Sequence, residues 1–319
     1  MRVFVAGATG VVGRQLVPQL VVAGHQVTAT TRNPAKAEDL RRLGAEPAVV
    51  DGLDAAAVGE AVARAAPEVV VHQMTALAVG FDLRHFDRTF AATNELRTTG
   101  TANLLAAAEA AGARRMIVQS YAGWANSMTG GPVKSEDDPF EPDLPKAIRP
   151  TQDAIKYIER AVASSPLEGI ALRYGNLYGP GATDLMVEVL RKRQVPVIGK
   201  GTGVWSFLHV QDAASAAVAA LDGAPPGVYN VVDDEPAPVS QWLPVLAAAV
   251  GAKPPLRVPS WLGRLVAGEA AVCMMTRVRG SSNAKAKREL GWQPAWPTWR
   301  DGFVHGLSAV TGNQAKHLR

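Results

Sequence analysis

The stretch that decides the fold of this 319-residue chain is Val3-Phe4-Val5-Ala6-Gly7-Ala8-Thr9-Gly10-Val11-Val12-Gly13. An apolar, β-type run leads into the glycines, and residues with helical spacing follow them at Leu16, Val17, Leu20 and Val21. Glycine lets the backbone turn sharply and approach a phosphate closely, and the next helix directs its N–H groups and positive dipole end toward it. Such glycines also occur in ordinary strand-to-helix turns. With a strand before them and a helix after them, they predict a site for a dinucleotide pyrophosphate.

The first half of the chain alternates between short apolar runs and alanine- and leucine-rich stretches of helical period. The strand-like runs are residues 2–6, 26–30, 46–50, 68–72, 115–119 and 169–173, and the helix-like stretches are 11–22, 35–43, 54–65, 87–111 and 151–164. This order predicts βαβ units and therefore an α/β fold of the Rossmann type, a doubly wound parallel sheet. Because ligands of such sheets bind at the carboxyl ends of the strands, we expect the functional residues there.

The pattern changes twice along the chain. Residues 126–150 contain five prolines, which predicts a long loop of the kind that often serves as a lid. After residue 175 the elements become short and are separated by Gly-Pro and proline-rich turns. We expect residues 1–175 to form a dinucleotide-binding domain and residues 176–319 to form mainly a smaller substrate domain. Part of residues 206–233 is expected to return to the sheet.

Composition excludes several classes of function. The 33 basic and 29 acidic residues are scattered, so the net charge of +4 does not indicate a nucleic-acid partner. The single cysteine, Cys273, is expected to be a small buried residue, and neither a disulfide nor a thiolate metal cluster can form within the chain. No signal peptide or membrane-spanning stretch is visible, so we expect a soluble, cytoplasmic protein without a metal site or a membrane partner.

Polar residues follow the predicted strands. Arg32 stands where NAD-binding sites usually carry a carboxylate for the ribose 2′-hydroxyl, and its guanidinium suits a 2′-phosphate. We therefore expect NADP(H) to be preferred, although NAD(H) is not excluded and Arg32 could be a simple surface residue. Asp51 could accept a hydrogen bond from the adenine, whereas Asp54 suits the start of a helix. His72 could face the cofactor or be a structural histidine.

Several further motifs occur in the same order as in one known family. They are Asn94 with Gly100-Thr101-Ala102-Asn103-Leu104-Leu105-Ala106-Ala107-Ala108, Leu172-Arg173-Tyr174-Gly175-Asn176-Leu177-Tyr178-Gly179-Pro180-Gly181, Trp205-Ser206-Phe207-Leu208-His209-Val210-Gln211-Asp212, Tyr229-Asn230-Val231 and Lys285-Ala286-Lys287-Arg288-Glu289-Leu290-Gly291-Trp292. Together with the glycine loop, they resemble the extended short-chain dehydrogenase/reductase family, also called the NAD-dependent epimerase/dehydratase family. Matching stretches run along nearly the whole chain.

The resemblance implies a Rossmann domain, a small C-terminal substrate domain and a set of cofactor contacts. These contacts would come from Gly7, Thr9, Gly10, Val11, Val12, Gly13, Arg32, Asp51, Gly52, Leu53, Gln73, Met74, Thr75, Asn94, Gln119, Lys156, Tyr174, Asn176 and Leu177. Asp51 would approach the adenine, Asn94 would support the active-site helix, and Asn176 would lie near the nicotinamide or the substrate.

The chain departs from the family at its catalytic pair. The family's Tyr-x-x-x-Lys places a phenol and an ammonium on one helix face, where the ammonium lowers the pKa of the phenol and binds the ribose. None of the five tyrosines here has a lysine four residues later. Aligning Lys156 with the family's lysine puts Gln152 at the tyrosine position. Aligning Glu159 with the family's downstream acid puts Thr151 and Ile155 at the two positions instead.

A different tyrosine is available at the end of the fifth strand. Tyr121 stands about where the family has its catalytic serine or threonine, and Ser120 matches one of the family's hydroxyl residues. Our hypothesis is that Tyr121 replaces the missing helix tyrosine as proton donor, with Lys156 on the ribose. The alternative is that Tyr121 only packs the pocket wall. Lys134, which we expect to be exposed, is a distant second candidate, and Tyr157 is expected to be a partly buried helix residue.

Three functions are compatible with these features. The first is an NADP(H)-dependent oxidoreductase that transfers hydride to a carbonyl or an activated alkene of a small metabolite. The second is a nucleotide-sugar epimerase or dehydratase with bound NAD, which Arg32 and the lost pair disfavour. The third is a sensor that binds NADP(H) without chemistry. A homodimer through the alanine-rich helix at 101–111 is compatible with the sequence.

Overall fold

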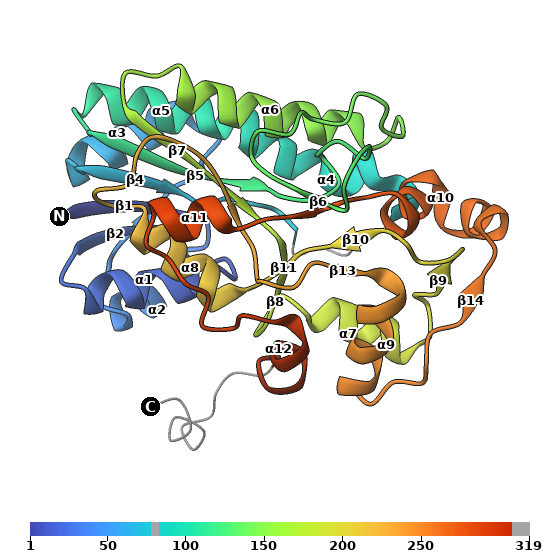
Figure 1. The fold of residues 1–319 in the computed structure, drawn as a ribbon. Helices are drawn as coiled ribbons and strands as arrows, with labels where there is room; N and C mark the ends of the chain where they lie inside the picture. The colour runs from blue at the N-terminus through green and yellow to red at the C-terminus, as the bar shows by residue number, and fades with distance from the viewer. Residues whose placement is uncertain (78–82, 308–319) are drawn as a thin grey trace.

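A seven-stranded parallel sheet forms the centre of the protein in the computed structural model, which describes residues 1–77 and 83–307 (Figure 1). Its strands are β1 (Arg2–Ala6), β2 (Gln26–Thr31), β3 (Glu46–Val49), β4 (Val69–His72), β5 (Arg115–Tyr121), β7 (Glu168–Tyr174) and β12 (Gly227–Val231). They lie in the order β12-β7-β5-β4-β1-β2-β3, and every adjacent pair is parallel. The direction of winding reverses between β1 and β4, where doubly wound sheets bind their ligands. The predicted fold class is confirmed.

Helices cover both faces of the sheet (Figure 1). One layer contains α1 (Gly13–Val22), α2 (Ala37–Arg42) and α8 (Val210–Ala219), and the other contains α3 (Ala55–Ala65), α4 (Phe86–Glu95), α5 (Thr101–Ala110) and α6 (Arg149–Ala163). Alternating side chains of β1 serve the two layers, because Val3 and Val5 pack with Leu16 whereas Phe4 packs with Leu104. This alternation explains why a nearly unbroken apolar run is required in a sheet covered on both faces.

Two predicted elements differ in the structure. The helical stretch predicted at 87–111 is divided into α4 and α5 by a π-helical turn, η3 (Leu96–Gly100). The predicted loop at 126–150 contains a short strand, β6 (Val133–Lys134), which pairs with β15 (Gly280–Ser281). That pairing joins the loop to a segment far away in the sequence, so local patterns could not reveal it.

Short elements after β7 lie beyond the carboxyl ends of the central strands (Figure 1). They are β8 (Asn176–Tyr178), α7 (Asp184–Arg191), β9 (Val197–Ile198), β10 (Val204–Trp205), β11 (Phe207–His209), β13 (Ala237–Pro238), α9 (Val239–Ala249), β14 (Arg257–Val258), α10 (Ser260–Thr276) and α12 (Trp299–His305). The helix α11 (Ala284–Glu289) packs instead against β12 of the central sheet. Two short helices, η1 (Pro34–Lys36) and η2 (Leu83–His85), lie in the first half of the chain. Trp242, Trp299 and Phe303 form the centre of a separate apolar cluster here. Residues 308–319 of the predicted substrate domain lie outside the described residues.

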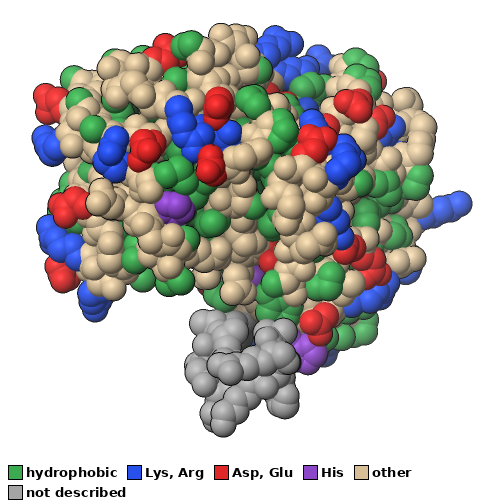
Figure 2. Space-filling model, turned by 60° about the vertical axis from the view of Figure 1, so that its left-hand side comes forward, with side chains coloured by type: hydrophobic (Ala, Val, Ile, Leu, Met, Phe, Trp, Pro, Cys, Tyr) green, Lys and Arg blue, Asp and Glu red, His purple; other side chains and the backbone are tan. Residues whose placement is uncertain are grey.

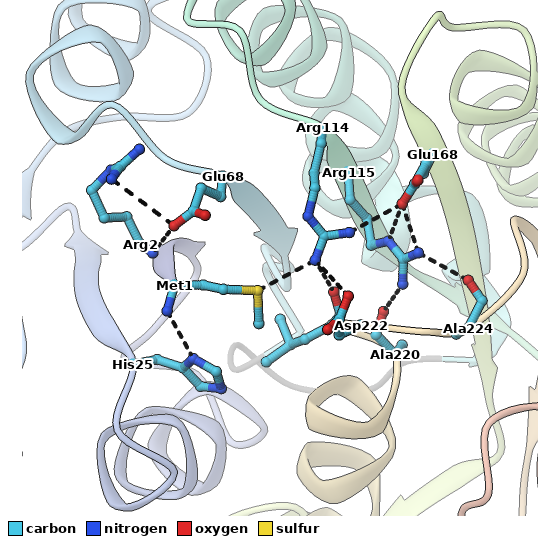
Figure 3. Close-up of polar contacts among 11 residues, drawn as sticks. Met1, Arg2, His25, Glu68, Arg114, Arg115, Glu168, Ala220, Asp222 and Ala224 are labelled. Carbon is cyan, nitrogen blue, oxygen red and sulfur yellow. Dashed lines mark hydrogen bonds and ion pairs between the residues drawn. The ribbon is translucent and has the colours of Figure 1, made fainter.

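At the amino ends of the strands, arginine side chains link neighbouring elements of the sheet and the helical layer (Figure 3). Arg115 at the start of β5 donates two hydrogen bonds to Glu168 at the start of β7, at 2.8 and 2.6 Å. Its third nitrogen donates to the Ala220 carbonyl just after α8, at 2.6 Å. Arg114 extends the network to Asp222 at 3.0 Å. These contacts fix the amino ends of the strands to the α8 layer and leave the carboxyl ends available for ligands.

Basic and acidic side chains are mixed on the surface of the protein. On the face shown in Figure 2, the side chains of lysine and arginine are interspersed with those of aspartate and glutamate. Within the described ranges, no helix combines the length and the apolar character that crossing a bilayer requires. Cys273 is buried, as the sequence predicts.

Asp233, two residues after β12, gives the fold a testable pH dependence. Its carboxyl group is 1% exposed, and its Oδ2 has no partner among the described residues. Burial raises the pKa of Asp233 to about 8, whereas an unfolded aspartate titrates at roughly 3.9. The folded state therefore binds more protons between these values, so the free energy of unfolding falls as pH rises from about 4 to about 8.

We expect Asp233→Asn to remove most of this fall between about pH 6 and 8, where Asp212, with its pKa raised to about 6, adds little further slope. Urea unfolding of both proteins at the two pH values measures the effect. At the upper pH the variant should be more stable than the wild type. Equal slopes for the two proteins would show that Asp233 is not the titrating group.

Candidate cofactor and active site

The glycine loop joins β1 to α1 with almost no free space. Gly7 has a φ of +88°, and a Cβ atom there would lie 2.6 Å from the backbone of Gln73. A Cβ on Gly13 would come within 2.5 Å of the Ala8 carbonyl oxygen. The loop is closed by a hydrogen bond from Gly10 N–H to the Gly7 carbonyl at 3.1 Å, and Gly7 N–H donates to Thr30 Oγ1 at 3.1 Å. Only glycine fits positions 7 and 13 without strain.

The loop has donors to offer a phosphate. Among the described residues, the N–H groups of Val11 and Val12 have no hydrogen-bond partner, and they lie at the start of α1. A helix start with free N–H groups and tightly packed glycines fits the pyrophosphate of a dinucleotide. The side chain of Thr9 is partly buried next to them, and its carbonyl accepts a hydrogen bond from Arg14 Nε at 3.0 Å.

The ends of β2 and β3 carry exposed polar side chains. Arg32 is exposed and makes no hydrogen bond or ion pair with another described residue. Asp51 is also exposed, and its carboxylate accepts the N–H of Leu53 at 3.1 Å, while the Gly52 carbonyl accepts from Asn103. Asp54 caps α3 by accepting the Ala57 N–H at 3.0 Å, as expected for a helix start.

The end of β4 is more enclosed. His72 is buried with both ring nitrogens in use: Nδ1 accepts from Met74 N–H at 3.1 Å, and Nε2 bonds the Leu96 carbonyl at 3.3 Å. Burial lowers the pKa of His72 to about 4, so it is a neutral, structural histidine. Gln73 donates to the Tyr174 hydroxyl at 3.1 Å, and that hydroxyl donates to the Ala213 carbonyl. The Tyr174 hydroxyl therefore links Gln73 to the backbone of α8.

Met74 and Thr75 continue from this point. Met74 lies against Gly52 and Gly100: a Cβ at Gly52 would overlap its sulfur, and a Cβ at Gly100 would lie 3.2 Å from its terminal methyl. Thr75 is partly buried.

Four side chains close to this end of β4 have buried polar atoms without partners among the described residues. They are Gln73 Oε1, Asn94 Oδ1, Thr101 Oγ1 and, on Arg97, Nε and Nη1. Buried polar groups are normally hydrogen-bonded. Unpartnered polar groups at the end of β4 and along the segment from α4 to α5 fit a polar ligand, and the glycine loop fits the pyrophosphate of a nicotinamide dinucleotide.

Tyr121 lies in the wall of a small pocket at the carboxyl end of β5, in which about 10 Å³ is open to the centre of a water molecule. The pocket is lined by Tyr121, Gly123, Trp124, Asn176, Val204, Trp205, Met274 and Val278. The Tyr121 hydroxyl donates to Asn176 Oδ1 at 3.0 Å, and Asn176 Nδ2 donates to the Ser206 carbonyl at 2.9 Å. Burial raises the pKa of Tyr121, which keeps the phenol protonated at neutral pH. Leu177 follows Asn176 in β8 and is partly buried.

The Ser120 hydroxyl is hydrogen-bonded to a buried ion pair between Glu159 and Arg173. The hydroxyl donates to Glu159 Oε1 at 2.6 Å, and Arg173 grips the same carboxylate through Nε at 2.7 Å and Nη2 at 2.8 Å. All three side chains are buried. This network joins β5, β7 and α6, so the described contacts of Ser120 are structural ones. Gln119 is partly buried on the same strand.

Lys156 also has partners other than the pocket residues. Its Nζ donates to Gln152 Oε1 at 2.8 Å and lies 5.4 Å from the centroid of the Phe140 ring. Gln152 in turn donates to the carbonyls of Ala125 and Glu141. Gln152 and Lys156 thus share a helix face, which packs on the loop that follows β5.

The two neighbouring positions on α6 are fully buried. Thr151 accepts a hydrogen bond from Asn94 at 3.0 Å, and Ile155 packs in the apolar cluster of Phe86 and Trp124, against which Tyr121 also lies. Neither alignment of α6 with the family restores a phenol and an ammonium. Tyr157, which the sequence predicts to be partly buried, is exposed at 40% because it lies on the outer face of α6.

The expectation for Lys134 was wrong. It is 6% exposed rather than on the surface, and its Nζ donates to the Thr129 carbonyl at 2.6 Å and to Asp138 at 3.1 Å. Both partners lie in the same loop as Lys134, and the pairing of β6 with β15 joins that loop to a distant segment.

Sequence reasoning missed Arg97. This residue lies in η3 and is 4% exposed. A signal was present, because Thr93, Arg97, Thr101, Leu104 and Ala108 recur at helical spacing, and all five are buried. A charged residue on an otherwise small or apolar helix stripe is unusual and marks a candidate functional position.

Comparisons with known proteins agree with this geometry. The NAD dependent epimerase/dehydratase family matches residues 3–231. A "3-diazoavenalumate denitrifying reductase" from Streptomyces sp is 47% identical over 309 residues, which cover 95% of this chain and 99% of that protein.

Two solved structures share the fold. A Thermus thermophilus UDP-glucose 4-epimerase in complex with NAD has a TM-score of 0.73 at 23% identity and covers 96% of this chain and 98% of its own. A human epimerase family protein with NADPH has a TM-score of 0.73 at 21% identity and covers 95% and 98%. The chain belongs to the NAD dependent epimerase/dehydratase family, and it is an NAD(P)-dependent enzyme of the extended short-chain dehydrogenase/reductase type.

Proposed function

We propose that this protein is an NADP(H)-dependent reductase that transfers hydride to an electrophilic group of a small, flat metabolite. The observation that carries the proposal is the pocket at the end of β5, where the Tyr121 phenol and Asn176 meet the aromatic walls Trp124 and Trp205. Aromatic side chains of this kind pack well against planar groups. The 47% identity to a reductase over nearly the whole chain supports a reductive role.

The protein's part in the reaction is positioning and proton transfer. Bound NADPH would supply the hydride. For a carbonyl or activated alkene, the Tyr121 Oη would hold the proton that the reduced product needs, and Asn176 orients that hydroxyl from 3.0 Å. Asn176 is itself fixed by its hydrogen bond to the Ser206 carbonyl. Because burial raises the pKa of Tyr121, the phenol keeps its proton at neutral pH and does not act as a base.

A second acceptor is favoured by the Streptomyces relative, whose name specifies a diazo compound and its denitrification. Hydride addition to a carbonyl leaves an oxyanion, which the family's tyrosine and lysine would serve. Hydride addition to a cationic diazonium group gives a neutral diazene and forms no oxyanion. A site without Tyr-x-x-x-Lys therefore suits a diazonium acceptor as well. Mass spectrometry of products from a panel of enones, aryl ketones and aryl diazonium salts incubated with NADPH separates the acceptors.

Cofactor choice rests on Arg32, and we expect Arg32→Ala to weaken NADPH binding by about 10- to 100-fold. A guanidinium hydrogen-bonded to a phosphate contributes about 1.5–3 kcal/mol, and each 1.4 kcal/mol is about tenfold in affinity. NADH lacks the 2′-phosphate, so its affinity should not change. Titration calorimetry with both nucleotides measures the difference.

The matched control is Arg64→Ala, which removes an exposed arginine from the far end of α3. It should bind both nucleotides like the wild type. An Arg32→Ala protein that loses NADPH and NADH affinity equally would remove the argument for a 2′-phosphate site. Tightly bound NAD in freshly purified wild-type protein would favour an epimerase-like enzyme with a captive cofactor instead.

A homodimer through α5 stays a prediction, which light scattering tests.

A further inference from the structure

Arg97 is a buried cation without a described partner. Its side chain is 4% exposed, and neither Nε nor Nη1 has a hydrogen-bond partner among the described residues. Burial lowers the pKa of Arg97 to about 10, which still leaves it charged at neutral pH. A buried charge without a partner is costly, and folded proteins rarely keep one unless a ligand uses it. Among the described residues with unpartnered buried atoms, Arg97 and Asn230 each have two such atoms, and of the two only Arg97 carries a charge.

The fold places this cation beside the ends of β4 and β5. The carbonyl of the preceding residue, Leu96, is bonded to His72 at the end of β4, at 3.3 Å. In the sheet His72 stands opposite Val118 of β5, and Tyr121 ends that strand. The charge of Arg97 also acts on the phenol, since it lowers the pKa of Tyr121 against the larger effect of burial. The π-helical turn η3 carries Arg97 here, and such turns are frequent at functional sites.

The helix that should supply a cation at this place does not. On α6, Ile155 packs beside Trp124 in the cluster against which Tyr121 lies, and Thr151 bonds Asn94. Lys156 is held by Gln152 and lies over Phe140. Within the described part of the chain, Arg97 is therefore the candidate for the positive charge that the family obtains from its lysine.

We propose that Arg97 binds the nicotinamide half of the dinucleotide, with its free Nε and Nη1 donating to the ribose hydroxyls, and so replaces the lysine of Tyr-x-x-x-Lys. In this position it also supplies the positive charge beside the Tyr121 phenol. Arg97 is then a cofactor-binding residue, and its unused donors are the site that the ribose completes. The proposal rests on the proposed function in that it requires NADP(H) to be the cofactor.

The test compares a whole cofactor with a fragment of it. NADPH contains the nicotinamide ribose, whereas 2′,5′-ADP contains only the adenosine half and the 2′-phosphate. We expect Arg97→Met to bind NADPH at least about tenfold more weakly and to bind 2′,5′-ADP like the wild type. Arg97→Lys should recover part of the NADPH affinity, because an ammonium can donate to the same hydroxyls. Titration calorimetry on the full-length proteins gives both affinities.

A thermal measurement without cofactor separates this role from a structural one. Replacing an unpaired buried charge by methionine of similar length should leave the unfolding temperature of the cofactor-free protein unchanged or raise it. The shift produced by NADPH should become smaller in the variant. An arginine with a structural role would give the opposite pattern, a lower unfolding temperature without cofactor.

Three results would overturn the proposal. The first is Arg97→Met losing NADPH and 2′,5′-ADP affinity alike. The second is unchanged NADPH affinity in that variant, above all if Lys156→Met loses it. The third is a wild-type protein that binds neither nucleotide. That result would overturn the proposed function as well, whereas the first two results overturn only the role of Arg97. The Arg64→Met protein serves as the control for removal of an arginine from the surface.

Discussion

Replacing Tyr121 with phenylalanine should lower kcat for a carbonyl or activated alkene by about 10²- to 10⁴-fold, the usual contribution of a positioned acid. The ring would remain between Trp124 and the pocket, so KM should change little. The loss is confined to the hydroxyl that donates to Asn176. Steady-state oxidation of NADPH with the substrate identified from the panel measures it.

Tyr157→Phe provides the control, because this tyrosine is 40% exposed on α6, is not among the residues that line the Tyr121 pocket, and should leave kcat unchanged when substituted. The same pair of variants also decides between the two acceptors. If the substrate is a diazonium compound, Tyr121→Phe should keep its rate within about tenfold, since no oxyanion is protonated. Unchanged turnover of a ketone by Tyr121→Phe would mean that Tyr121 only packs the pocket wall.

The second large effect is expected at Gly13. In Gly13→Ala the new methyl group would overlap the carbonyls of Gly7 and Ala8, which are backbone atoms and cannot move aside easily. Overpacking of this kind costs about 1–3 kcal/mol. The glycine loop must then distort, and we expect NADPH affinity to fall by about 10- to 100-fold. Calorimetric titration reports the affinity, and urea unfolding reports the stability.

Gly59→Ala is the matched substitution, since Gly59 lies inside α3 and a Cβ there meets nothing within 4 Å. Alanine in a helix interior should stabilise the protein by about 0.5–1 kcal/mol and leave NADPH binding intact. Tight NADPH binding by Gly13→Ala would show that the loop tolerates a side chain and does not need its observed shape.

The sheet was predictable because its information is local. In β1, apolar residues serve one face at Val3 and Val5 and the other at Phe4, and the glycines that follow fix the turn into α1. The chain also carries its helix start at Asp54 within a few residues. Periodicity and turn chemistry decide these features before any distant contact forms.

The site was only partly predictable, since side-chain direction depends on contacts between distant segments. Lys156 turns toward Gln152 and Phe140 because the loop after β5 packs there. Lys134 is buried in the loop whose strand β6 pairs with β15. The position of Arg97 depends on the π-helical turn η3, and no glycine or proline before Gly100 in this helical segment predicts such a turn. The contact of Lys156 with Gln152 follows from helix spacing, but its place over Phe140, the burial of Lys134 and the place of Arg97 do not.

The position of β12 has a consequence for how the chain can be synthesised and divided. This strand pairs with β7, yet Gly227 stands opposite Ile170, so the whole of β8 to α8 separates the partners. Until that length of chain has been made, β7 is an unpaired edge of a largely apolar sheet. The sheet therefore closes late, after many residues of the substrate-side region exist, which raises the contact order of the fold. A fragment ending near residue 175 would leave this edge bare and prone to pair with other chains, so the two regions are built to fold as one unit.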